Sequence, residues 1–321
     1  MGRHALVTEP GTHPPSTHPP GSPAPSSRSL GDDPTEVGRA LGAAGYVADD
    51  EIAAAVHLTI ALRRPLLLEG PPGVGKTSLA RAVSQASGRS LVRLQCHEGI
   101  DAQHALYEWD YGRQLLATQI LAAERASAPD GDGELAAATS ALFAEEFLLE
   151  RPLLTALRSA DPVVLLVDEL DRADDALDAL LLETLDERQV TIPELGTIEA
   201  RSDPWVFITS NESRELADAV RRRCLRIGLS YPDPDREAEI IESAVPGITR
   251  DLQDAVVDAL NRLRTLGLEQ PPGVSEGLDW AKALLLLGAD ELDDATIDRT
   301  LLTLVKRNRD VEAARTELAA G

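Results

Sequence analysis

The sequence predicts an α/β fold in which helices cover both faces of a parallel sheet, followed by a small all-α lobe. Short apolar runs suited to buried strands occur at residues 65–69, 91–95, 163–167, 205–209 and 225–229, and helical patterns alternate with them. The first of these runs leads directly into a glycine-rich loop. After residues 232–234, Pro-Asp-Pro, every pattern is helical.

The chain is expected to divide into three parts. Residues 1–40 are rich in Pro, Ser, Thr and Gly and lack apolar periodicity, which predicts a disordered tail. Residues 41–231 should form the α/β domain, with a mainly helical insertion at about 98–160 and a hairpin at 190–200. Residues 232–321 should form the helical lobe, with helices near 248–263, 277–287 and 295–305.

Composition narrows the class of protein. The 321 residues include 54 acidic and 31 basic side chains, a formal charge of −23. We therefore expect no nucleic-acid partner, because such surfaces neutralise phosphates with Lys and Arg. Two cysteines cannot make a disulfide framework, and the apolar runs are too short to span a bilayer, so we expect a cytoplasmic protein without a membrane span.

The glycine-rich loop matches the pattern G-x-x-x-x-G-K-[ST] of phosphate-binding P-loops, at the strand-to-helix position where that motif works. Its backbone N–H groups and the following helix N-terminus suit the phosphates of ATP. We expect Lys76 to bridge the β- and γ-phosphates and the Thr77 hydroxyl to ligate Mg²⁺. The expected ATP-binding residues are Gly70, Pro71, Pro72, Gly73, Val74, Gly75, Lys76, Thr77 and Ser78.

Two adjacent carboxylates, Asp168 and Glu169, follow the apolar run 163–167. Open α/β sheets place their ligands at this end of the strands. Asp168 is expected to hold Mg²⁺, directly or through water, and Glu169 to polarise the attacking water. The alternative is an acidic pair that only caps the next helix.

Two further polar features follow the run 205–209. Asn211 stands where a side chain can sense the γ-phosphate and position water, although an Asn there is also a common turn former. Three arginines at 221–223 lie further on. They suit an arginine finger that reaches the γ-phosphate of a neighbouring subunit, or else a solvated face.

These motifs resemble the AAA+ ATPases of the MoxR type, and within them the CoxD-like branch associated with maturation of carbon monoxide dehydrogenase. The resemblance covers residues from about 45 to 287. Besides the nucleotide motifs it includes Tyr-Glu-Trp109, Val-Asp-Glu-Leu-Asp-Arg-Ala-Asp174, Ile-Pro-Glu-Leu-Gly196, Arg-Arg-Cys224 and Leu-Asp-Trp280. It implies an AAA+ P-loop αβα sandwich followed by a small all-α lid domain.

The resemblance also implies a function and partners. It implies a homo-oligomeric ring, usually a hexamer, that hydrolyses ATP to remodel or mature a metalloenzyme, often beside a protein with a von Willebrand factor A domain. Arg223 is then the first choice for the finger and Arg222 the second. The insertion and the hairpin would face the pore or the client, although a sheet-edge hairpin without a client role is an alternative. We expect Tyr46 and Val47 to border the adenine.

One departure concerns the lid. Many MoxR proteins carry a nucleotide-sensing arginine at the start of the lid helix, within Gly-Ala-Ser-Pro-Arg. Here the corresponding residues 273–277 read Gly-Val-Ser-Glu-Gly, which places Gly277 at that position. Lys282 is the only basic residue of the expected helix 277–287. Sensing by the lid is therefore in doubt, and slow turnover is an expected consequence.

Two other functions remain open. One is a nucleic-acid AAA+ ATPase of the clamp-loader type, which Arg-Arg-Cys224 also suits and which the net acidity disfavours. The other is a P-loop kinase for a small molecule, which the pair Asp168-Glu169, the arginines and the helical lobe disfavour.

Overall fold

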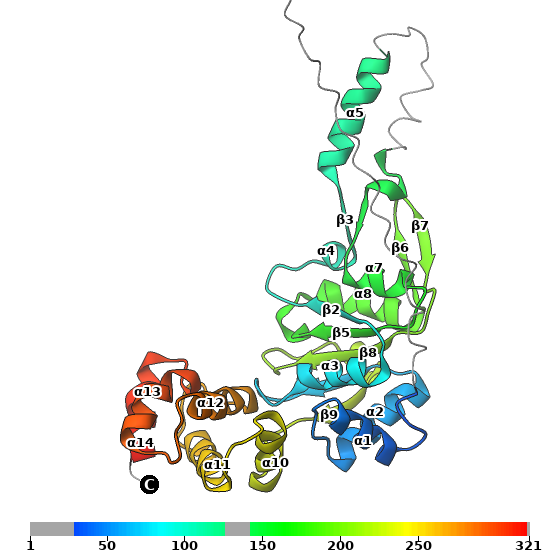
Figure 1. Ribbon diagram of the computed structural model, residues 1–321. Helices are drawn as coiled ribbons and strands as arrows, with labels where there is room; N and C mark the ends of the chain where they lie inside the picture. Colours follow the sequence, from blue (N-terminus) through cyan, green and yellow to red (C-terminus); the bar gives the residue numbers. More distant parts are fainter. Residues whose placement is uncertain (1–28, 126–141, 320–321) are drawn as a thin grey trace, which may run out of the picture.

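The structure is a computed structural model that describes residues 29–125 and 142–319. Its centre is a five-stranded sheet in the order β2-β5-β8-β1-β9, and each neighbouring pair is parallel (Figure 1). The strands are β1 (Leu66–Glu69), β2 (Leu91–Gln95), β5 (Val164–Asp168), β8 (Trp205–Ser210) and β9 (Leu225–Gly228). The predicted α/β fold class with a parallel sheet and a helical C-terminal region is confirmed.

Helices cover both faces of the sheet because the inner strands are apolar on both faces. Leu66 and Leu68 point to one core, which α1 (Pro34–Ala43), α2 (Asp50–Leu62) and α3 (Lys76–Ser87) complete. Leu67 points to the other core, where α4 (Ala102–Leu106), α7 (Pro152–Arg158) and α8 (Asp175–Asp186) pack. This double burial explains why strands β1, β5 and β8 read as continuous apolar runs.

Helix α1 corrects the predicted disordered tail, whose first 28 residues lie outside the described part of the chain. The helix begins at Pro34, after Asp33, whose carboxylate accepts a hydrogen bond from the backbone N–H of Glu36 at 2.9 Å. Val37 and Leu41 are one turn apart and fully buried. The tail prediction is therefore wrong for residues 34–40, because two well-spaced apolar side chains suffice to dock this helix.

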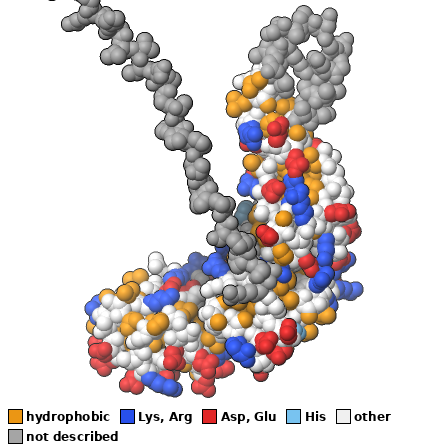
Figure 2. Space-filling model, turned by 45° about the vertical axis from the view of Figure 1, so that its right-hand side comes forward, with side chains coloured by type: hydrophobic (Ala, Val, Ile, Leu, Met, Phe, Trp, Pro, Cys, Tyr) orange, Lys and Arg blue, Asp and Glu red, His pale blue; other side chains and the backbone are white. Residues whose placement is uncertain are grey.

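Within the segment 98–160, the described residues 98–125 and 142–160 combine helices with a small sheet. They include α4, α5 (Tyr111–Arg125), the 3₁₀ turn η1 (Glu145–Phe147) and α7, and also the antiparallel strands β3 (Tyr107–Trp109) and β4 (Leu148–Glu150). Helix α5 and the sheet of β3 and β4 are together called the arm. The sequence did not predict these strands, because three residues are too few to show a period. Figure 1 shows α5 projecting from the domain, and Figure 2 shows hydrophobic side chains on this arm, where Tyr111, Leu115, Leu116 and Ile120 are exposed.

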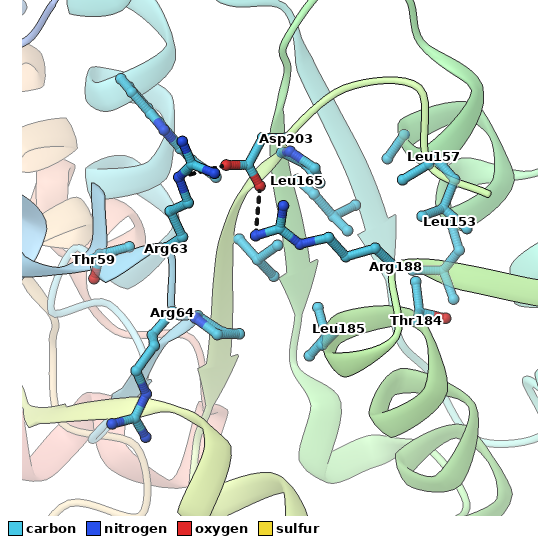
Figure 3. Close-up of a pocket in the computed structure, with 16 residues that line it drawn as sticks. Thr59, Arg63, Arg64, Leu153, Leu157, Leu165, Thr184, Leu185, Arg188 and Asp203 are labelled. Carbon is cyan, nitrogen blue, oxygen red and sulfur yellow. Dashed lines mark ion pairs between the residues drawn. The ribbon is translucent and has the colours of Figure 1, made fainter. Parts of the chain in front are cut away.

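The hairpin consists of β6 (Gln189–Ile192) and β7 (Gly196–Glu199), paired antiparallel. Its base is tied to the amino edge of the main sheet. The Asp203 carboxylate lies between the guanidinium groups of Arg63, at 3.3 Å, and Arg188, at 3.0 Å (Figure 3).

The region after residue 232 is helical throughout its described length. It consists of α10 (Pro234–Ala244), α11 (Arg250–Thr265), α12 (Val274–Leu286), α13 (Asp294–Leu304) and α14 (Asn308–Ala319). At its centre Trp280 is fully buried and donates its indole N–H to the Thr300 hydroxyl at 2.8 Å. None of the helices in the described ranges is long and apolar enough to cross a membrane.

Candidate functional site

The P-loop lies between β1 and α3 and depends on glycines with left-handed backbone. Gly73 has a φ of 78° and Gly75 a φ of 97°, values that L side chains rarely adopt. Gly70 has no room for a side chain either, because an added Cβ would collide with the carbonyl oxygen of Leu229 on the β9 side. Helix α3 begins at Lys76 directly after this turn, so its free N–H groups face the loop.

Lys76 is buried at the centre of the site. Its ammonium donates to the carbonyl oxygens of Gly70 at 2.5 Å and Pro71 at 2.7 Å, and to Asn211 Oδ1 at 2.8 Å. Burial lowers the pKa of Lys76 below its ordinary value of 10.5, although nearby carboxylates, led by Asp171, oppose that shift. The ammonium thus lies at the mouth of the loop, where three oxygen acceptors surround it.

Asp168 ends β5 with its carboxylate almost fully buried, at 2% exposure. Oδ1 accepts hydrogen bonds from the hydroxyls of Thr77, at 2.9 Å, and Thr209, at 2.7 Å. Oδ2 accepts two from the Arg93 guanidinium, at 3.0 Å from Nε and 2.6 Å from Nη2. The predicted metal-site pair Thr77 and Asp168 is therefore brought together, with two partners that the sequence did not predict.

Glu169 follows in a left-handed conformation, with a φ of 57°. Its backbone N–H donates to the Thr209 hydroxyl at 2.8 Å, which supports this unusual turn. One carboxylate oxygen accepts from Gln95 Nε2 at 3.2 Å and the other from Asn211 Nδ2 at 3.3 Å. Both are long bonds, and Arg172 Nε adds a half-exposed ion pair to one of the oxygens at 3.4 Å, so each contact of the Glu169 carboxylate is longer than 3 Å.

Asn211 stands just after β8 and joins the two halves of the site through Lys76 and Glu169. Its backbone N–H donates to the buried Asp171 carboxylate at 3.1 Å, and Ser213 donates to the same carboxylate from its N–H, at 2.9 Å, and its hydroxyl, at 2.5 Å. Burial raises the pKa of Asp171, but these hydrogen bonds outweigh it and hold the pKa below its ordinary value.

Sequence reasoning missed Thr209, Arg93, Gln95 and Asp171 as members of the site. Their contacts follow from strand register: β2 pairs with β5 so that Gln95 lies opposite Asp168, and β8 brings Thr209 to the same edge. The only signal in the sequence was their position near the ends of predicted strands, which is too general to single them out.

Two adjoining cavities lie along the loop. The smaller, of about 130 Å³, is lined by residues that include Lys76, Thr77, Asp168, Glu169 and Asn211. The larger, of about 340 Å³, is lined by residues that include Tyr46, Val47, Ile227, Tyr231 and Leu278. Gly75, Ser78 and Ser275 border both cavities. A polar chamber beside a larger, more apolar one suits phosphates followed by a nucleobase.

The larger cavity combines apolar and aromatic side chains with charged ones, which include Asp49, Asp233 and Arg236. Burial raises the pKa of Tyr46 to about 12, so its phenol is uncharged near neutrality. Tyr46 also lies against Gly75, where an added Cβ would come 3.6 Å from its ring. The structure thus places both predicted adenine-pocket residues, Tyr46 and Val47, next to the P-loop.

The helical region after residue 232, which is the expected lid, meets the P-loop directly. The N–H of Val274, the first residue of α12, donates to the Gly73 carbonyl at 2.8 Å, and an added Cβ on Gly273 would come within 2.6 Å of the Gly73 Cα. Gly277, at the position of the family's sensing arginine, faces the lid core: an added Cβ there would lie 2.6 Å from Leu260 Cδ1. Close glycine packing thus brings α12 to the loop, and a Cβ at position 277 would point into the lid.

The arginines at 221–223 lie on the short helix α9 (Asp218–Arg223) and differ in their partners. Arg221 lies 3.7 Å from Glu69, whereas Arg223 forms an ion pair with Asp186 on α8. Arg222 is exposed and makes no ion pair with a described residue. The Arg64 guanidinium donates to the carbonyl oxygens of Arg222, at 2.8 Å, and Arg223, at 3.0 Å, and so fixes the end of the helix.

Other candidate sites are weaker. The cavity in Figure 3, beside Asp203, Arg63 and Arg188, measures about 30 Å³, room for roughly one water. Among the described residues no cluster of three or more His, Cys, Asp or Glu side chains could hold a metal ion. Burial raises the pKa of both thiols, Cys96 and Cys224, to about 12, which leaves them unreactive.

Comparison with known proteins agrees with this geometry. Residues 65–224 match the family described as AAA domain (dynein-related subfamily). Protein NorQ of Paracoccus denitrificans is 24% identical over 294 residues, which cover 89% of this chain and 96% of that protein. Midasin of Dictyostelium discoideum is 34% identical over 152 residues, which are 47% of this chain and 2% of that protein.

Among solved structures, the RuvB Holliday junction branch migration motor of Thermotoga maritima aligns with 78% of this chain and 66% of its own. The identity is 18% and the TM-score 0.43. The match to the family, together with the parallel sheet and the glycine loop ahead of α3, leads to one conclusion: residues 65–224 resemble the AAA domain and have its P-loop α/β fold.

Proposed function

We propose that this protein hydrolyses ATP to ADP and phosphate in the two adjoining cavities along the P-loop. One observation carries the proposal. The two oxygens of the Glu169 carboxylate are held at long hydrogen-bond distances between Gln95 and Asn211, while Asn211 also bonds to Lys76. A loosely held carboxylate beside a buried ammonium is what a water-activating base next to a γ-phosphate requires.

Each residue has a stated role. The amides of residues 70–78 surround the phosphates, and the Lys76 ammonium leaves its carbonyl partners for the β- and γ-phosphates. The Glu169 carboxylate accepts a hydrogen bond from the attacking water. Asn211 orients that water and senses the γ-phosphate. Tyr46 and Val47 border the adenine.

The donor set also suits Mg²⁺. The Thr77 hydroxyl and the Asp168 carboxylate are hard oxygen groups within hydrogen-bond distance of each other. Mg²⁺ in phosphate sites uses one or two protein ligands and takes the rest from water and phosphates, so a cluster of three carboxylates is not needed. When bound, the ion would neutralise charge that develops on the phosphate oxygens.

The arginines of α9 support an active site shared between copies of the chain. Arg223 is the proposed finger and Arg222 the alternative, acting on the γ-phosphate of a neighbour in a ring, as the MoxR resemblance implies. The exposed side chain of Arg222 and the half-exposed Asp186 pair of Arg223 leave both free to engage a partner at small cost.

The protein on which the ATPase acts is proposed from the same resemblance. We propose that the ring remodels or matures a protein client, a molybdenum-containing metalloenzyme of the carbon monoxide dehydrogenase type, beside a protein with a von Willebrand factor A domain. The exposed apolar side chains of α5 support a client-contact role for the arm. The net charge of −23 gives the clamp-loader alternative no support.

The test is phosphate release by the purified chain. Wild-type protein should release phosphate from ATP, and Glu169→Gln should retain ATP binding and lose nearly all release. Asp174→Asn likewise replaces a carboxylate by its amide, at an exposed position nearby, and is the matched control that should keep wild-type turnover. Normal turnover by Glu169→Gln would remove the water-activation role. Phosphorylation of a small molecule without free phosphate would favour the kinase alternative.

Mixing variants tests the shared site. Glu169→Gln lacks the base but keeps the finger, whereas Arg223→Ala lacks the finger but keeps the base. If the finger acts between copies, a mixture should release more phosphate than either variant alone. A mixture no more active than its components would place the finger role elsewhere, with Arg222→Ala as the next variant to test.

A further inference from the structure

The unusual feature of the site is the Arg93 guanidinium on the carboxylate of Asp168. Arg93 lies on the edge strand β2, two residues before Gln95, which pairs in register with Asp168. Its side chain runs along the sheet to reach Asp168 Oδ2 with two nitrogens, at 3.0 Å and 2.6 Å. The same guanidinium also donates to Gln95 Oε1.

These contacts fill the carboxylate of Asp168. A carboxylate has about four acceptor positions. The hydroxyls of Thr77 and Thr209 take two on Oδ1, and Arg93 takes two on Oδ2. Only 2% of the surface of Asp168 is exposed, although the residue also borders the smaller cavity.

The hydroxyl donors and the guanidinium donor differ in whether a cation can approach the Asp168 carboxylate. The Thr77 hydroxyl can keep donating to Asp168 while its own lone pair faces a cation, because a hydroxyl both donates and accepts. A guanidinium only donates and always carries a positive charge, so it repels a cation from Oδ2. Direct coordination by Asp168 would therefore require Arg93 to leave.

We propose that Arg93 is a positioning residue that keeps Asp168 in the outer shell of the metal and excludes free divalent cations until ATP delivers one. The ion then enters as its ATP complex, which phosphate oxygens and Thr77 would hold, with Asp168 acting through the Thr77 hydroxyl. This inference rests on the proposed function of the site, and it argues against the direct coordination that the sequence left open for Asp168.

The chain offers a matched control. Arg188 resembles Arg93 in exposure, 42% against 41%, and each is paired with an aspartate. The partner of Arg188 is Asp203, at the amino edge of the sheet (Figure 3). Arg188→Gln therefore removes the same charge and an ion pair, to an aspartate whose side chain is 34% rather than 3% exposed, without touching the carboxyl ends of the strands.

The experiment measures Mn²⁺ binding to the full chain by electron paramagnetic resonance, first without nucleotide. Wild type and Arg188→Gln should show no saturable binding at millimolar Mn²⁺, whereas Arg93→Gln should bind at least about tenfold more tightly. Arg93→Gln combined with Asp168→Asn should lose that gain, which locates the ion. Arg93→Lys keeps the charge with a single nitrogen, and should bind Mn²⁺ more weakly than Arg93→Gln.

Two results would overturn the inference: tight Mn²⁺ binding by nucleotide-free wild type, which needs no variant to fold, or an Arg93→Gln protein that gains nothing. A second arm adds ATP. Wild type should then bind Mn²⁺, and failure there would count against the proposed function itself. A nucleotide-free gain in Arg93→Gln would still stand in that case, so the two failures are distinguishable.

Discussion

Asp171 is the residue on which the position of Asn211 depends, and its removal gives the sharpest prediction about the site. Its carboxylate is 4% exposed and accepts three hydrogen bonds from Asn211 and Ser213. Asp171→Ala leaves two backbone N–H groups and one hydroxyl without that partner. Hydrogen bonds to charged groups contribute about 1.5–3 kcal/mol each, and water can replace part of this in the half-exposed loop. We expect a loss of about 3 kcal/mol in the free energy of unfolding.

The functional effect follows from the same loop. Asn211 contacts both Lys76 and Glu169, so a shift of its backbone disturbs the water more than the bound nucleotide. We expect kcat for phosphate release to fall by about 10- to 100-fold with little change in KM, because small misplacements near reacting atoms have effects of this order.

Urea unfolding and steady-state phosphate release measure the two effects. Asp174→Ala is the control: this aspartate is exposed, three residues further on, and its side chain makes no capping hydrogen bond. It should change stability by less than about 0.5 kcal/mol. If Asp171→Ala matched this control in both assays, the network would not be what positions Asn211.

Two further predictions concern the lid and the P-loop lysine. Glu237 and Arg264 form a buried pair with two hydrogen bonds of 2.7 Å, so Glu237→Ala should cost about 3–5 kcal/mol in urea unfolding, and a cost below 1 kcal/mol would contradict this. Because burial lowers the pKa of Lys76 below 10.5, the nucleotide-free folded chain releases that proton before the unfolded chain does. Raising the pH through that window should increase the free energy of unfolding and weaken ATP binding, and Lys76→Met should remove this part of both pH dependences.

The sequence predicted the site where its chemistry is local. The spacing within residues 70–77 and the adjacency of Asp168 and Glu169 are complete in one short stretch each, so composition and pattern suffice. Arg93 and Thr209 could not be predicted in this way. They reach Asp168 only because parallel pairing sets β2 and β8 on either side of β5.

For the fold, too, only elements with a pattern of their own in the sequence could be predicted. The apolar strands of the main sheet and the amphipathic helices show a recognisable hydrophobic pattern in the sequence. The predicted strand positions therefore agree closely with those in the structure. Strands β3 and β4 have three residues each and depend on Trp109, which packs edge-on against Tyr107 and Phe143 at ring distances of 5.8 and 5.4 Å. Helix α1 was missed because the Pro-rich composition before it outweighed two well-placed apolar residues.

The central claim is that Glu169 activates water on an ATP molecule bound along the P-loop. The most direct measurement is the identity of the nucleotide bound to purified Glu169→Gln protein after prolonged incubation with ATP and Mg²⁺, read by chromatography of the released nucleotide. Our account predicts intact ATP on the variant and ADP on the wild type. ADP on both proteins would show that the water is activated without Glu169. If neither protein carried bound nucleotide, the proposed nucleotide site itself would be wrong.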